Sequence, residues 1–64
     1  MMPQINDYIY KEGKPWKVKE IRHFNFTGIN YIIFVCENGK ETRSFEKNGI
    51  RWESIPEEIK AELV

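Results

Sequence analysis

The fold depends on residues 31–45, which read Tyr-Ile-Ile-Phe-Val-Cys-Glu-Asn-Gly-Lys-Glu-Thr-Arg-Ser-Phe. Two runs with strand composition flank Asn38-Gly39, and a two-residue hairpin loop needs positive φ angles that Asn and Gly adopt most easily. The sequence therefore predicts a β-hairpin that turns at Asn38-Gly39 and places Phe34 opposite Arg43. Its first strand is apolar on both faces, which is typical of a central strand covered on both sides.

The segment before this hairpin predicts a long strand that begins at Trp16 and changes phase along its length. Its apolar positions do not share one parity: Trp16, Val18, Ile21, Phe24 and Phe26. A β-bulge adds one residue and returns the following side chains to the inner face, and small barrels bend their strands in this way. We therefore expect one bulge near Lys19-Glu20 and another near Arg22-His23. The alternative is that Phe24 or Phe26 lies outside the core, in a loop that ends at Thr27-Gly28.

The flanking segments predict further strands and turns. Tyr8-Ile9-Tyr10 has the composition of a short strand, and residues 12–15 have that of the turn after it. Residues 46–49 predict a second turn, and residues 50–53 a short closing strand with Ile50 and Trp52 on one face. Together with the central hairpin and the bent strand, these segments predict a small antiparallel barrel of about five strands.

The last residues predict a short helix. Ser54-Ile55-Pro56-Glu57 has capping-box spacing, and proline is favoured in a first helical turn. Ile55, Ile59 and Leu63 recur every four residues, which places one apolar stripe on the sheet side. We expect this helix, over residues 56–63, to cover one open end of the barrel, and residues 1–6 to fray unless Ile5 packs against the core.

Length and composition limit the class of protein. The 64 residues form one small domain, residues 1–64, and the single cysteine excludes an intramolecular disulfide. No Cys and His cluster has metal-ligand spacing, no run approaches the ~20 apolar residues of a membrane span, and the N-terminus lacks signal-peptide features. The formal net charge of zero argues against an unselective polyanion binder. We expect a cytoplasmic protein without cofactor or metal, which acts as a monomer or a homodimer.

The sequence offers no active site. Cys36 and His23 are the one nucleophile and base that could be paired, yet Cys36 lies inside an apolar strand, where a free cysteine usually acts as a small buried hydrophobe. Nothing near it in sequence would lower the pKa of its thiol. Asp7 is better explained as a turn or strand start than as a magnesium ligand. We predict that the chain is not an enzyme.

Basic and aromatic residues are interleaved near the start of the chain: Tyr10, Lys14, Trp16, Lys17, Lys19 and Arg22, with Tyr8 and Lys11 beside them. Nucleic-acid surfaces use such residues, because cations neutralise phosphates and rings stack on bases. This interpretation needs Tyr10 and Trp16 to be exposed. If Trp16 belongs to the core, Lys17 and Lys19 simply form a solvated face that protects the strand.

Arg43 is the second candidate, because it occurs on a face that is otherwise apolar. An arginine there must reach solvent, stack on an aromatic ring, or meet a carboxylate such as Glu41 or Glu53. It could equally mark the mouth of a ligand site together with Phe45.

The order of elements resembles a Src-homology-3-like (SH3-like) small barrel. Residues 7–18, Asp-Tyr-Ile-Tyr-Lys-Glu-Gly-Lys-Pro-Trp-Lys-Val, are similar to the start of KOW-type barrels, which often bind RNA or ribosomal and transcription proteins. The stretch from Asn30-Tyr31 through Arg43-Ser44-Phe45 is similar to the closing part of WYL domains, with Asn30 where that pattern usually has Trp. That resemblance implies a ligand-sensing or nucleic-acid-sensing face at Tyr31, Arg43 and Phe45.

Two functions follow as hypotheses. The first is a non-catalytic binding module that contacts nucleic acid through Tyr10, Lys14, Trp16, Lys17, Lys19 and Arg22. The second is a protein-interaction module, such as an inhibitor or adaptor of phage or plasmid type, that pairs through an exposed strand edge or an aromatic patch.

Overall fold

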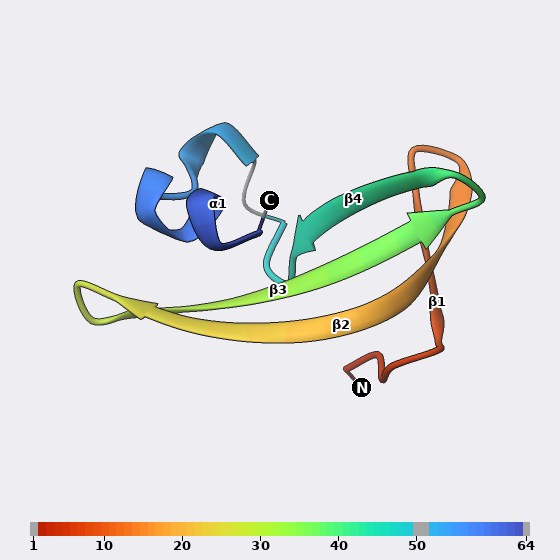
Figure 1. The fold of residues 1–64 in the computed structure, drawn as a ribbon. Helices are drawn as coiled ribbons and strands as arrows, with labels where there is room; N and C mark the ends of the chain where they lie inside the picture. Colours follow the sequence, from red (N-terminus) through yellow and green to blue (C-terminus); the bar gives the residue numbers. More distant parts are fainter. Residues whose placement is uncertain (1, 50–51, 64) are drawn as a thin grey trace.

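Four antiparallel strands form one curled sheet in the order β1-β2-β3-β4 (Figure 1). The computed structural model describes residues 2–49 and 52–63, and of Trp52 only the backbone. The elements are β1 (Tyr8–Lys11), β2 (Lys14–Phe26), β3 (Ile29–Asn38), β4 (Glu41–Glu46), the 3-10 helix η1 (Trp52–Ser54) and α1 (Glu57–Leu63). In Figure 1 the β2–β3 hairpin crosses the molecule, β1 and β4 lie at one end of it, and α1 lies above the other end. The chain is therefore a mainly β half-barrel with one short C-terminal helix.

Three two-residue loops join the strands, and the first two share one geometry. Glu12-Gly13 has φ angles of 56° and 74°, and Thr27-Gly28 has φ angles of 51° and 82°. Positive φ at both positions defines a type I′ turn, whose twist matches that of the flanking strands. These turns set the register of β1 on β2 and of β2 on β3.

The central hairpin turns one residue later than predicted. Asn38 pairs with Glu41, so the loop is Gly39-Lys40 and only Gly39 has a positive φ, of 60°, as in a type II′ turn. The Asn38 side-chain amide donates to the Pro15 carbonyl oxygen at 2.7 Å, which holds Asn38 within the sheet. The predicted Phe34–Arg43 pairing is therefore wrong, and Phe34 lies opposite Phe45. A shift of this kind moves the pairing by two residues and keeps each side chain on its predicted face.

The bulge expected near Lys19-Glu20 is confirmed, because the register of β2 on β3 shifts between Val18 and Glu20. The second expected bulge is wrong, since β2 pairs with β3 without interruption from Glu20 to Phe26. Phe24 does not return to the first face, because it packs with Phe26 on the opposite face of the sheet. The alternative, a loop containing these two rings, is also wrong, since both belong to β2.

Two hydrophobic cores explain this arrangement, one on each face of β3. The first, on the inner face, is built from Trp16, Val18, Phe34 and Cys36. The second, on the outer face, is built from Tyr31, Ile33, Ile55 and Ile59. The prediction that this strand is central and covered on both sides is confirmed. Ile55, just before α1, and Ile59 within it belong to the second core, and Leu63 packs against it, as the spacing of these three residues predicts.

The predicted closing strand is wrong where the structure describes it. Residues 52–54 form η1, which leads into α1 and inserts Ile55, 3% exposed, into the second core. Residues 50 and 51 of that prediction lie outside the described residues. The described sheet thus has four strands, and β1 and β4 are its two edges.

The first residues are held against the sheet by Met2, which packs on the first core, while Ile5 is 54% exposed. The Asn6 amide donates to the Val18 carbonyl at 2.8 Å, and the Gln4 amide donates to the Asp7 carboxylate at 2.9 Å. Asp7 thus closes a turn before β1, which matches its structural interpretation. Within the described residues, no helix is both long and apolar enough to cross a bilayer.

Candidate functional site

The structure divides the predicted basic and aromatic residues between the two faces of the sheet. Tyr8 pairs with Lys17 and Tyr10 with Pro15, so these residues share the outer face, where Tyr10 is 75% exposed. Trp16 lies on the inner face and is fully buried. The rings that could stack on a ligand are therefore the two tyrosines of β1.

Trp16 has structural contacts on several sides. Its indole N–H donates to the Lys11 carbonyl at 3.2 Å, and the Phe45 ring meets it edge-on with centroids 5.4 Å apart. The Arg43 guanidinium stacks over the indole at 5.2 Å and is held there by the carboxylates of Glu12 and Glu41. Arg43 thus does all three things expected of it: it stacks on a ring, it meets Glu41, and its side chain, 43% exposed, reaches solvent.

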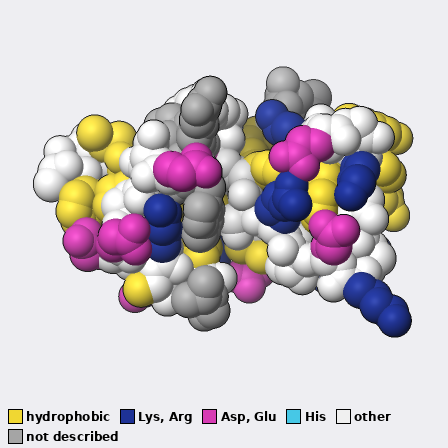
Figure 2. Space-filling view, turned by 90° about the horizontal axis from the view of Figure 1, so that it is seen from above, with side chains coloured by type: hydrophobic (Ala, Val, Ile, Leu, Met, Phe, Trp, Pro, Cys, Tyr) yellow, Lys and Arg dark blue, Asp and Glu magenta, His cyan; other side chains and the backbone are white. Residues whose placement is uncertain are grey.

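Three of the four predicted cations already have a carboxylate neighbour. Lys14 lies 3.8 Å from Glu41, Lys19 lies 3.5 Å from Glu37, and Arg22 lies 3.7 Å from Glu62. Figure 2, viewed from the side of α1 and β4, shows basic and acidic side chains interspersed over the visible face. Paired charges attract polyanions weakly, because the field of each cation is cancelled nearby. Lys17 is the predicted cation without such a pair among the described residues.

The residues implied by the WYL resemblance do not form one surface. Tyr31, 7% exposed, belongs to the second core, on the outer face of β3. Arg43 and Phe45 lie on the inner face, against Trp16. The sheet separates these three side chains.

The edge strand β1 carries the exposed aromatic side chains. Tyr8 is 59% exposed and Tyr10 is 75% exposed. A two-residue loop is flanked by a hydrogen-bonded pair, here Lys11 and Lys14, and such pairs alternate along an antiparallel ladder. The N–H and C=O groups of Tyr8 and Tyr10 therefore point away from β2. An edge with exposed rings and free backbone groups on the same two residues can accept another strand.

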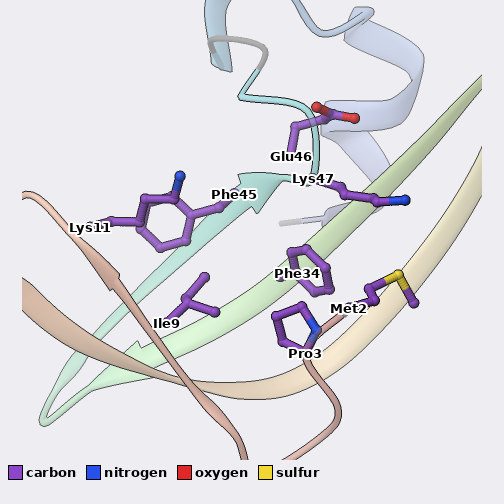
Figure 3. A pocket seen from close by; sticks show the side chains of 8 residues that line it. All are labelled: Met2, Pro3, Ile9, Lys11, Phe34, Phe45, Glu46 and Lys47. Atoms are coloured by element: carbon purple, nitrogen blue, oxygen red, sulfur yellow. The ribbon is translucent and has the colours of Figure 1, made fainter.

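A cleft of about 530 Å³ opens on the inner face beside β1 (Figure 3). Ile9 and Lys11 line it from β1, Phe34 from β3, and Phe45 from β4; the remaining lining residues are Met2, Pro3, Glu46 and Lys47. Its lining is mostly apolar, with charged groups at Lys11, Glu46 and Lys47. The cleft was not predicted; Ile9 reaches the inner face because it pairs with Trp16 across β1 and β2.

The candidate nucleophile and base lie at different places along β3, since Cys36 pairs with Val18 and His23 with Ile32. Cys36 is fully buried, and that burial raises the pKa of its thiol to about 11, so the reactive thiolate is scarce near neutral pH. His23 is exposed in β2 and pairs across the sheet with Ile32. No group of three or more His, Cys, Asp or Glu residues in the described part could hold a metal ion.

Comparison with known proteins identifies no relative: no family model, curated protein or solved structure matches the chain. Any function must therefore be argued from the surface itself.

Proposed function

We propose that this chain is a non-catalytic protein-interaction module that binds a partner through strand β1. One observation carries the proposal: β1 is an edge of the sheet and also holds two exposed tyrosines, Tyr8 and Tyr10. Exposed edges readily pair with another chain, and tyrosine is enriched at protein interfaces. The proposed binding mode is addition of a partner strand to β1.

The other edge supports this choice by contrast. Strand β4 reads Glu-Thr-Arg-Ser-Phe-Glu and carries three charged residues, Glu41, Arg43 and Glu46. Charged side chains are a usual protection of an edge against unwanted pairing. Strand β1 reads Tyr-Ile-Tyr-Lys and contains neither proline nor a bulge, so Lys11 is its one such protection.

A nucleic-acid surface is the second candidate, and one observation favours it. Lys17 shares the outer face with Tyr8 and Tyr10 and lies directly opposite Tyr8. Cations beside exposed rings suit single strands, since bases stack on rings while phosphates meet cations. The burial of Trp16, the ion pairs of Lys14, Lys19 and Arg22, and the net charge of zero make this the weaker candidate.

The resemblance to an SH3-like barrel belongs to the same proposal. The curled four-stranded sheet is compatible with a small barrel, and an added strand at β1 would extend it. The KOW-type and WYL resemblances remain hypotheses of the same kind. A cytoplasmic location also belongs here, because the one cysteine, Cys36, is free.

Site-specific crosslinking tests the proposal. A photoreactive phenylalanine replaces Tyr10 in one variant and Ile29 in the control, because Ile29 is 51% exposed in the hairpin at the far end of the sheet. We expect position 10, and not position 29, to crosslink a specific protein in a lysate of the source cells. The identified partner is then purified and titrated with the parent chain.

Two variants complete this test. Tyr10→Lys should weaken the purified complex by more than about tenfold, because a central aromatic residue is removed and a charge is placed on the edge. Ile29→Lys should leave the affinity unchanged. Equal crosslinking from both positions, or equal affinity of both variants, contradicts the proposal. Salt-sensitive binding of oligonucleotides that shifts the Tyr8, Tyr10 and Lys17 amides would favour the second candidate.

A further inference from the structure

The cleft beside β1 has features that indicate what kind of segment β1 accepts. Its walls include Ile9 from one edge strand, Phe45 from the other, and Phe34 from β3 beside them (Figure 3). At about 530 Å³ it falls in the ~300–1,000 Å³ range typical of binding clefts. Binding of an apolar side chain against these walls is favourable, because it removes apolar surface from water.

The charged side chains at this cleft favour an acidic ligand. Lys11 from β1 and Lys47 after β4 both line it, and neither has an ion pair within residues 2–49 and 52–63. Glu46 also lines the cleft, but it is 5% exposed and its carboxylate accepts a hydrogen bond from the Asn48 amide. Lys11 and Lys47 are exposed, whereas the Glu46 carboxylate is buried and hydrogen-bonded, so the rim of the cleft is positively charged. A carboxylate on the ligand would complement Lys11 and Lys47.

The position of the cleft links it to the β1 edge. Successive side chains of a strand point to opposite faces of a sheet. A segment paired with Tyr8–Lys11 would therefore place one set of side chains beside the exposed tyrosines. The other set would lie on the face of Ile9 and Lys11, which is the face of the cleft.

We infer that β1 binds an extended acidic and apolar segment of a partner protein. Apolar side chains at alternate positions enter the cleft against Ile9, Phe34 and Phe45, and a neighbouring Asp or Glu pairs with Lys11 or Lys47. This inference rests on the proposed function in taking β1 as the binding edge, and it adds the chemistry of the partner. A second copy of this chain fits less well, because its own β1 would bring another lysine to a positive rim.

A peptide selection tests the inference with the full chain as bait. A random heptapeptide display library should enrich sequences in which apolar residues alternate and at least one Asp or Glu is present. The best peptide, made synthetically, should lose about tenfold in affinity for the Lys11→Glu, Lys47→Glu double variant, since two exposed ion pairs are reversed. Lys40→Glu is the matched control, because Lys40 is exposed in the β3–β4 turn and does not line the cleft.

Strand addition has its own control. N-methylation of alternate peptide amides removes donors from one edge of the ligand only, so one of the two methylated registers should abolish binding while the other retains it. Amide shifts of Tyr8 and Tyr10, with side-chain shifts of Ile9, should accompany binding of the active peptides.

Several results would overturn the inference. They are a selection without enrichment, enriched peptides that lack acidic residues, equal affinity of the double variant and Lys40→Glu, or insensitivity to N-methylation. Concentration-dependent dimerisation that blocks the peptide would instead identify a second copy as the occupant and would also reject it. The crosslinking experiment at position 10 does not depend on the peptide experiment. A specific crosslink together with a failed peptide test therefore rejects this inference and leaves the proposed function intact.

Discussion

Deletion of Lys19 should leave the fold intact, whereas deletion of Lys17 should unfold much of the protein. Val18 pairs with Cys36 and Glu20 with Val35, so Lys19 is the extra residue of the bulge. Without Lys19, Val18 and Glu20 become neighbours with regular alternation, and the side chains of β2 keep their faces. Without Lys17, Trp16 directly precedes Val18 and turns to the outer face if Val18 keeps its pairing with Cys36.

The size of the effect of deleting Lys17 follows from the burial of Trp16, which is 0% exposed. Removing a buried Trp side chain from a core costs about 3–5 kcal/mol. Domains gain roughly 0.05–0.15 kcal/mol per residue, which for 64 residues is about 3–10 kcal/mol. The expected loss is therefore comparable with the whole stability of the fold. Deletion of Lys19 removes only the bulge and the exposed ion pair with Glu37, which contributes about 0–1 kcal/mol.

Urea denaturation monitored by circular dichroism measures the free energy of unfolding of both deletion variants, and an amide NMR spectrum reports on packing. Lys17→Ala is the control, because it removes the side chain without moving Trp16 to the other face. The variant without Lys17 should show little or no cooperative transition, whereas the variant without Lys19 should unfold cooperatively within about 1 kcal/mol of the parent. Equal stability of the two deletion variants would refute the argument that Lys19 is the extra residue that sets the phase of the strand.

Three further predictions concern the cores and the helix. Ile59→Ala should lower the free energy of unfolding, measured in urea, by about 2–5 kcal/mol, because Ile59 is 3% exposed in the second core. The control Glu58→Gln changes an exposed residue and should alter this free energy by about 0.5 kcal/mol or less. Equal effects of the two variants would contradict the role given to α1. Burial raises the pKa of Cys36 to about 11 from an ordinary 9.0, so the unfolded state loses its proton first as pH rises. Stability is therefore full below about pH 9 and falls by about 2 kcal/mol by pH 11. Cys36→Ala, measured across the same pH range, should lack this part of the decline. Arg22→Ala should lower the free energy of unfolding by about 1–2 kcal/mol, because it removes the hydrogen bond to the Glu62 carbonyl, at 3.1 Å, and the stacking on Phe24, at 5.4 Å. Arg22→Lys should recover part of this loss. An Arg22→Ala variant as stable as the parent would show that this contact does not hold α1.

Local patterns were sufficient for the elements that neighbouring residues define. The apolar run of β3, the bulge at Lys19 and the stripe of Ile55 and Ile59 were all predicted, because the period of a strand or helix is written into the sequence itself. The turn at residues 38–39 was misplaced by one, since Asn38 is held in the strand by Pro15, a residue far away in sequence. The second bulge was wrongly predicted because the pattern assumed a single core.

The candidate site was harder to predict, because exposure depends on which face of the sheet is covered. The basic and aromatic pattern grouped Tyr10 with Trp16, but these residues lie on opposite faces, one exposed and one buried. The pattern also could not show that Lys19 and Arg22 would meet carboxylates on other elements.

The sequence by itself determined a mainly β chain with a central strand apolar on both faces, a bulged second strand and a terminal amphipathic helix, since these depend on spacing within each segment. Only the tertiary structure decided that there are two cores, that β1 remains an edge of the described sheet, and that Ile9, Phe34 and Phe45 border a cleft. These features depend on how distant segments pack, and packing is a property of the whole chain that no local period records.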